Sequence, residues 1–165
     1  IAAANAGPVL ALACGDCHNG LFLAERGATV LCWDGSGDAL AEARLLARAS
    51  GAAATFQQVD LEREGAAPLP AEAFGAIIVF RYLHRPLIEP LRRAIIPGGV
   101  LVYETFTADH KQFGRPRNPA HLLEPGELNR WFRDWEILHS FEGILSDPPR
   151  AVARLVCRKP AALLR

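Results

Sequence analysis

Residues 8–36, which read PVLALACGDCHNGLFLAERGATVLCWDGS, decide the fold. Two short apolar runs at 9–13 and 29–33 flank a turn and a helical segment that Gly27 ends. Uninterrupted apolar runs of this length are typical of parallel strands buried on both faces. The stretch therefore predicts a strand, a helix and a second, parallel strand, which together form a βαβ unit.

The same alternation continues along the chain. Further strands are predicted at 55–59, 76–80, 100–106, 135–141 and 151–158, and helices at 20–26, 37–50, 87–96 and 125–132, with a long loop at 107–124. The last two strands are joined by a Pro-rich turn, which makes them an antiparallel pair. We therefore expect one α/β domain over residues 1–165. Its doubly wound sheet has seven strands and is mostly parallel, with an antiparallel last strand.

Composition limits the class of protein. The chain has 165 residues, half of them hydrophobic, and 18 basic side chains balance 18 acidic ones. A formal charge of zero argues against a nucleic-acid partner, and no apolar run reaches the roughly 18 residues that cross a bilayer. The absence of any methionine predicts that an N-terminal segment has been removed. Four cysteines without a signal peptide indicate reduced thiols and a cytoplasmic location.

The turn at residues 14–18, Cys-Gly-Asp-Cys-His, admits three interpretations. As Cys-x-x-Cys-His it matches the attachment site of a c-type haem, and as a strand–Cys-x-x-Cys–helix it matches a thioredoxin-like redox motif. As a tight turn before a helix, it is a degraded nucleotide loop in which Cys17 replaces the middle glycine. The cysteine disfavours a ligand with a pyrophosphate group, such as NAD, more than it disfavours S-adenosylmethionine, which has no pyrophosphate. A plain strand-to-helix turn with two buried thiols is a further alternative.

Two carboxylates favour the nucleotide interpretation. Asp34 and Asp60 are each the first charged residue after an apolar strand, so both lie at the edge of the sheet where ligands bind. A carboxylate there can accept hydrogen bonds from both ribose hydroxyls. The second carboxylate, with the amide of Leu61, can bind the amino edge of adenine. The alternative for each aspartate is a helix cap.

At this point the sequence resembles class I S-adenosylmethionine-dependent methyltransferases. Residues 8–36 resemble the first two motifs of that class. YLHRPL (82–87), IIPGGVLVYETF (95–106) and FGRPRNPAHLLEPGEL (113–128) resemble small bacterial tellurite-resistance-type members. The resemblance implies a Rossmann-like methyltransferase fold and S-adenosylmethionine as the cofactor.

The resemblance also implies a set of cofactor-binding residues: Cys14, Gly15, Asp16, Asn19, Asp34, Gly35, Ser36, Asp60, Leu61 and Arg81. Gly15 and its neighbours would hold the methionine part, and Asn19 would close the loop. Asp34 would bind the ribose and Ser36 would flank the adenine. Two positions depart from the family pattern. Ala11 stands where an acidic residue is usual and removes a carboxylate, and Cys17 stands where a glycine is usual and crowds the methionine tail.

The expected catalytic residues are Tyr82, His84 and Tyr103. Arg81 and Tyr82 would line the side where the methyl group is transferred. An OH or NH acceptor needs a general base, for which His84 and Tyr103 are the candidates; the alternative for His84 is a capping or packing residue. The loop at 107–124 is rich in basic residues, and Arg115 and Arg117 are expected to form a lid over an anionic acceptor. A solvated basic loop is the alternative.

We therefore expect a methyltransferase that acts on a small-molecule acceptor, such as a chalcogen oxyanion or another small anionic nucleophile. The alternative is a module that binds S-adenosylmethionine or S-adenosylhomocysteine with weak or no turnover. An NAD-dependent oxidoreductase is disfavoured by Cys17, by Asp60 and by the lack of a substrate domain. We expect no metal, no nucleic acid and no membrane partner.

Overall fold

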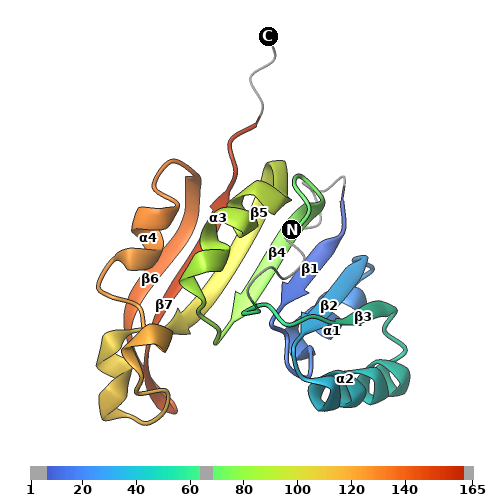
Figure 1. Ribbon diagram of the computed structural model, residues 1–165, viewed down its shortest axis with the longest axis horizontal. Helices are drawn as coiled ribbons and strands as arrows, with labels where there is room; N and C mark the ends of the chain where they lie inside the picture. Colours follow the sequence, from blue (N-terminus) through green and yellow to red (C-terminus); the bar gives the residue numbers. More distant parts are fainter. Residues whose placement is uncertain (1–6, 64–68, 162–165) are drawn as a thin grey trace.

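The computed structural model describes residues 7–63 and 69–161 (Figure 1). The strands are β1 (Val9–Leu12), β2 (Val30–Asp34), β3 (Ala54–Gln58), β4 (Phe74–Phe80), β5 (Ile95–Phe106), β6 (Glu136–Ser146) and β7 (Pro149–Arg158). The helices are α1 (His18–Ala24), α2 (Gly37–Ser50), α3 (Ile88–Ala94) and α4 (Glu127–Trp131), with short 3-10 helices η1 (Arg85–Leu87), η2 (Ala108–Gln112) and η3 (Pro119–His121). The expected removal of an N-terminal segment concerns a part of the chain outside the described residues.

The strands form one seven-stranded sheet in the order β3-β2-β1-β4-β5-β7-β6. The neighbours from β3 to β5 are parallel, and β7 is antiparallel to both β5 and β6. This confirms the predicted mostly parallel sheet with an antiparallel last strand. The chain winds from β1 outward to β3 and then crosses back to β4. The strand order therefore reverses between β1 and β4, and in open α/β sheets ligands bind at such a switch point.

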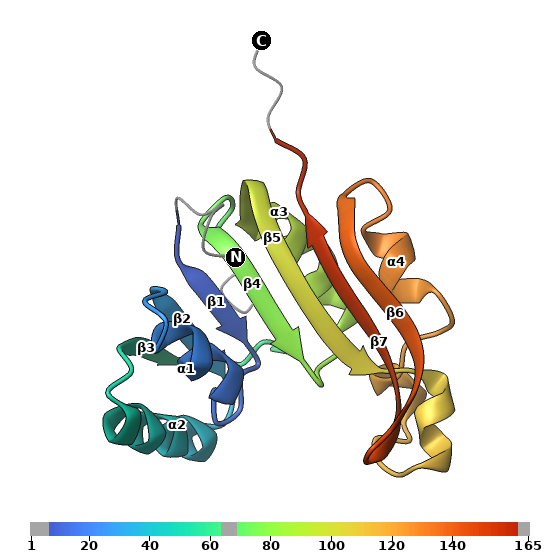
Figure 2. The same ribbon diagram turned by 180° about the vertical axis from the view of Figure 1, so that it is seen from behind.

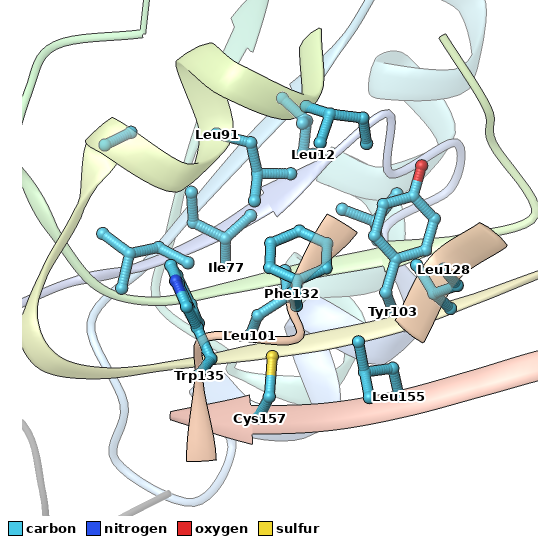
Figure 3. Close-up of a cluster of buried hydrophobic side chains, with 14 of the residues drawn as sticks. Leu12, Ile77, Leu91, Leu101, Tyr103, Leu128, Phe132, Trp135, Leu155 and Cys157 are labelled. Atoms are coloured by element: carbon cyan, nitrogen blue, oxygen red, sulfur yellow. The ribbon is translucent and has the colours of Figure 1, made fainter. Parts of the chain in front are cut away.

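Alternate residues of β1 contribute to two cores on opposite faces of the sheet. Leu10 and Leu12 belong to the larger core, which α3 and α4 cover and in which Phe132 is fully buried (Figure 3). Val9 and Ala11 belong to the smaller core, which α1 and α2 cover. Figure 2 shows α1 over β1 and β2, whereas β5, β7 and β6 carry no helix of the described chain on that face. Both faces of β1 are buried, as its apolar run predicts.

Local signals place the boundaries of α2 correctly. The Ser36 side chain accepts a hydrogen bond from the Ala39 amide, and Gly51 ends the helix with a φ of 74°.

Two predicted segments differ in the structure. The segment at 107–124, predicted as a loop, contains η2 and η3. The helix predicted at 87–96 ends at Ala94, and β5 begins at Ile95 rather than at residue 100, with an irregularity where Gly98 has a φ of 77°. No helix in the described parts of the chain is long and apolar enough to cross a membrane.

A disulfide joins Cys17, at the start of α1, to Cys32 in β2. The prediction of four reduced thiols is therefore wrong for this pair, while Cys14 and Cys157 are free. Packing of α1 on β2 brings the two residues together, with a Cα–Cα distance of 6.3 Å. Gly20 makes this approach possible, because a Cβ atom there would lie 2.6 Å from the Cys17 sulfur. Such proximity depends on the packing of helix on sheet, so sequence spacing does not reveal it.

Candidate functional site

A pocket of about 310 Å³ lies at the carboxyl ends of β1, β2 and β4. It is lined by Ala13, Gly15, Asp34, Gly35, Asp60, Leu61, Glu62, Arg81 and Tyr82. Most of the residues that the sequence predicts for cofactor binding are therefore brought to one place. The pocket lies beside β1 and β4, where the strand order reverses. This is the place that the fold predicts for a ligand.

Asp34 ties the turn after β1 to the turn after β2. Its Oδ2 accepts a hydrogen bond of 2.7 Å from the Gly15 amide, and its Oδ1 accepts one of 2.8 Å from the Ser36 amide. These bonds hold the half-buried carboxylate in one orientation at the pocket. A carboxylate offers about four acceptor sites, so two remain for the hydroxyls of a ligand. The arrangement fits a ribose.

The Gly15 turn places backbone rather than side chains against the pocket. Gly15 has a φ of 57°, which favours glycine, and Cys17 has the same φ at the residue before α1. The Cys17 side chain is directed to Cys32 and does not line the 310 Å³ pocket. It lines instead a smaller cavity of about 30 Å³, as does Ala11. The two positions that depart from the family pattern thus lie together, beside the larger pocket.

Asp60 both caps a turn and lines the pocket. Its Oδ1 accepts hydrogen bonds of 3.1 Å from the Glu62 and Arg63 amides. No helix starts among the described residues 61–63, so Asp60 caps a turn there rather than a helix, and it lies at the pocket beside Leu61. Glu62 is a pocket residue that sequence reasoning missed, because an exposed glutamate after a strand carries no distinguishing signal.

Arg81 and Tyr82 form the wall at the end of β4. Arg81 has a φ of 55° and donates its amide to the Glu104 carbonyl at 2.8 Å, which ends the strand in a sharp turn. The hydroxyl oxygen of Tyr82 is buried and has no hydrogen-bond partner among the described residues. Burial, together with the charge of Glu62, raises the pKa of Tyr82. The hydroxyl therefore stays protonated and is available as a donor to a polar group of a ligand.

Tyr103 does not reach the pocket. Its side chain is 2% exposed in the larger core (Figure 3), and its hydroxyl donates a 2.9 Å hydrogen bond to the Tyr82 carbonyl. Burial raises the pKa of Tyr103. The prediction of Tyr103 as a general base is therefore corrected: it positions Tyr82. His84, the residue before η1, is half-buried and does not line the pocket.

Cys14 is half-buried beneath the pocket. Burial, followed by the charge of Asp34, raises the pKa of the Cys14 thiol to about 12. The redox interpretation of residues 14–18 needs a thiol with a lowered pKa and a bond between Cys14 and Cys17, and neither is present. The haem interpretation needs both sulfurs, and the Cys17 sulfur is joined to Cys32. The nucleotide loop is the interpretation that fits.

Besides Cys14, three residues predicted to bind the cofactor do not line the 310 Å³ pocket. The Asp16 carboxylate accepts a hydrogen bond of 3.2 Å from the His18 amide, and the Ser36 hydroxyl caps α2. Asn19 is exposed on α1 and lines the smaller cavity. Local backbone hydrogen bonds thus use two of these side chains, which is the common role of Asp and Ser at a helix start.

The segment predicted as a lid lies at the same edge of the sheet, below β5, β6 and β7 (Figure 1). Arg115 and Arg117 are exposed and do not line the pocket. His110, in contrast, is buried: its Nδ1 accepts from the Ala151 amide at 3.3 Å, and its Nε2 lies 3.0 Å from the Arg115 carbonyl. His110 thus anchors the segment to β7.

Arg85, in η1, connects this 3-10 helix to η3 and to α4, a role that the sequence did not predict. Its guanidinium donates two hydrogen bonds, of 2.7 and 2.9 Å, to the Glu127 carboxylate of α4. It also donates hydrogen bonds to the Ala120 and Leu122 carbonyls. Burial would raise the pKa of Glu127, but the hydrogen bonds from Arg85 and the Glu124 amide, together with the charge of Arg85, outweigh it and the pKa is lowered. The pair is 42 residues apart, so no local pattern indicates it.

Comparisons with known proteins agree with this geometry. The profile of a family described as "Methyltransferase domain" matches residues 9–99. Among solved structures, TehB from Haemophilus influenzae has a TM-score of 0.74 and 22% identity. The match covers 92% of this chain and 57% of TehB, so the chain spans little more than half of that protein.

Two further structures match over most of both chains. An S-adenosylmethionine-dependent methyltransferase from Mesorhizobium loti has a TM-score of 0.71 and 21% identity, with 92% of this chain and 90% of that one covered. One from Methanosarcina mazei has a TM-score of 0.72 and 18% identity, with 93% and 92% covered. A comparison with curated protein sequences found no match. At these identities the structural likeness shows the fold.

Proposed function

The chain belongs to the methyltransferase domain family, and from this we propose that it transfers a methyl group from S-adenosylmethionine to a small-molecule acceptor. The membership confirms the predicted family, and S-adenosylmethionine is the cofactor that it implies. The observation that carries the proposal is the pocket in which Asp34, Gly15 and Asp60 meet. These residues come from three different turns, and they meet where the fold binds ligands.

The pocket residues fit the cofactor. Asp34 would bind the ribose hydroxyls with its free acceptor sites, and the Gly15 turn would present backbone to the methionine part. Asp60 and Leu61 would contact the adenine edge. The unpartnered hydroxyl of Tyr82 offers a donor to a polar group of the cofactor or the acceptor.

The same residues indicate the class of acceptor. When bound, S-adenosylmethionine supplies an electrophilic methyl group, and the protein must hold a nucleophile in line with it. No histidine lines the described pocket, and Tyr82 stays protonated. The carboxylates of Asp34, Asp60 and Glu62 are then the candidate bases among the described pocket residues, and a nucleophile that is already ionised needs none of them. Arg81, in the pocket wall, offers a positive charge to such an anion.

We infer on this basis a small anionic acceptor of the chalcogen oxyanion type. The resemblance of residues 82–87, 95–106 and 113–128 to tellurite-resistance-type enzymes supports it. Arg115 and Arg117 would attract the anion as a lid. The neutral overall charge supports a small molecule rather than nucleic acid.

Calorimetry and a turnover assay together test the function. The full chain is titrated with S-adenosylmethionine, S-adenosylhomocysteine and NADH, and release of S-adenosylhomocysteine is measured with selenite, tellurite and neutral phenols as acceptors. We expect binding of both sulfur nucleosides, none of NADH, and turnover with an oxyanion. Binding without turnover on any acceptor would favour the alternative of a binding module. If neither S-adenosylmethionine nor S-adenosylhomocysteine binds, both the methyltransferase and the binding module are contradicted.

Replacing Arg115 and Arg117 together with alanine tests the lid. We expect KM for the anionic acceptor to rise about tenfold while kcat changes little, because the arginines concentrate the anion without contacting the reacting atoms. The matched control is Arg48→Ala, an exposed arginine in the last turn of α2. An unchanged KM in the double variant would show that the segment is a solvated basic surface.

A further inference from the structure

Three of the four cysteines converge below the Gly15 turn. The sulfur atoms of Cys14, Cys17 and Cys32 all lie within 4.8 Å of one another. Two of them form the disulfide between α1 and β2, and the Cys14 thiol is free beside it. The methyl transfer proposed above uses none of these sulfurs, so the cluster is unexplained by that function.

The spacing of this cluster is that of a metal site. Sulfur ligands at about 2.3 Å around a tetrahedral zinc ion lie about 3.8 Å from each other. The Cα–Cα distance of 6.3 Å between Cys17 and Cys32 leaves room for their sulfurs to separate to that distance once the bond between them is reduced. Cys14 already lies within 4.8 Å of both. Small side-chain rotations therefore suffice to place three sulfurs around one ion.

An adjoining space can receive the ion. The cavity of about 30 Å³ is lined by Cys14 and Cys17, together with Asn19 and Gly20, and the Cys32 sulfur lies behind that of Cys17, to which it is bonded. A cavity of roughly 15 Å³ already holds a water molecule, so this one accommodates a metal ion or the water that completes its coordination. Cys14 is half-buried and Asn19 is exposed, which gives the cluster a route to solvent, while Cys17 and Cys32 are buried.

We propose that, after reduction of the Cys17–Cys32 disulfide, Cys14, Cys17 and Cys32 bind one thiophilic divalent cation of the zinc and cadmium class. A dithiol reductant supplies two electrons and two protons to the disulfide and is itself oxidised to a cyclic disulfide. The cation then displaces the three thiol protons, which pass to solvent, and forms three metal–sulfur bonds. A bound divalent cation keeps its coordinating thiols deprotonated. The site departs from the expectation that the chain holds no metal.

Reduction decides which state forms. In a reducing compartment such as the cytoplasm, a disulfide is kept as two thiols. The metal-bound and disulfide states exclude each other, because both use the Cys17 and Cys32 sulfurs. Either state links the turn before α1 to β2, so each would hold the Gly15 turn in place.

A cadmium titration tests the proposal. The full chain is reduced with dithiothreitol, separated from the reductant without oxygen, and titrated with Cd²⁺ while the sulfur-to-cadmium charge-transfer absorption is recorded. We expect the absorption to saturate at one Cd²⁺ per chain. The same protein kept in its disulfide form should show no such band. This comparison uses the wild-type chain alone, so it does not depend on how any variant folds.

Two variants locate the site. Cys14→Ser should lower the affinity for Cd²⁺ on the order of a hundredfold, because one of three sulfur ligands is lost. Cys157→Ser should leave the affinity unchanged, since Cys157 lies in the core on the opposite face of the sheet (Figure 3). The proposal is overturned if the reduced wild-type chain gives no band, if Cys14→Ser binds as tightly as wild type, or if Cys157→Ser loses binding to the same extent.

Discussion

Asp34→Asn is expected to weaken S-adenosylmethionine binding by about a hundredfold, or roughly 3 kcal/mol. The charge that would bind the ribose hydroxyls is lost, and charge-assisted hydrogen bonds are worth more than neutral ones. The new amide group would also face the amide of Gly15 or Ser36, both of which now donate to the Asp34 carboxylate. The turn that carries Gly15 then loses its anchor. Calorimetry on wild type and variant measures the change.

Asp38→Asn is the matched control for this substitution. Asp38 is exposed in the first turn of α2, four residues from Asp34, and it does not line the pocket. Its loss of charge should cost a few tenths of a kcal/mol in the stability of the helix and leave cofactor affinity unchanged. Equal affinities for Asp34→Asn and wild type would show that the pocket does not bind the ribose in the proposed way.

Arg85→Met should lower the free energy of unfolding by about 3 kcal/mol and the Tm by about 10 °C. The substitution removes the hydrogen bonds to Glu127 and to the Ala120 and Leu122 carbonyls, and it leaves the Glu127 carboxylate without its partner. The Glu127 side chain is only 12% exposed, so water replaces little of what is lost. Denaturant unfolding measures the effect, and Arg93→Met, at an exposed position on α3, is the control.

The pH dependence of stability distinguishes the ion pair from mere packing. Because the pKa of Glu127 is lowered in the folded state, its contribution to stability is present above the ordinary value of 4.5 and is lost as the pH falls through the folded value. The free energy of unfolding of wild type should therefore approach that of Arg85→Met as the pH falls. A difference between the two proteins that stays constant down to pH 3 would contradict the role of the ion pair.

Much of the site could be predicted because it follows from strand ends. Gly15 and Asp60 closely follow the ends of two parallel strands, Asp34 is the last residue of a third, and parallel strands end at one edge of the sheet. The prediction that Tyr103 is a general base failed for a different reason. Tyr103 lies near that edge in sequence, but the alternation of side chains along β5 turns it into the core, where its hydroxyl donates to the Tyr82 carbonyl.

The amino-acid sequence by itself determined the order of the elements, the direction of the strands and the edge at which the pocket forms. These follow from hydrophobic periodicity, turn residues and the handedness of βαβ units, all of which are local. Only the tertiary structure decided the Cys17–Cys32 pair, the Arg85–Glu127 contact and the convergence of three cysteines. Each depends on how a helix or a 3-10 turn packs against an element distant in sequence. Packing geometry of that kind is set by the whole core, and no short stretch of residues encodes it.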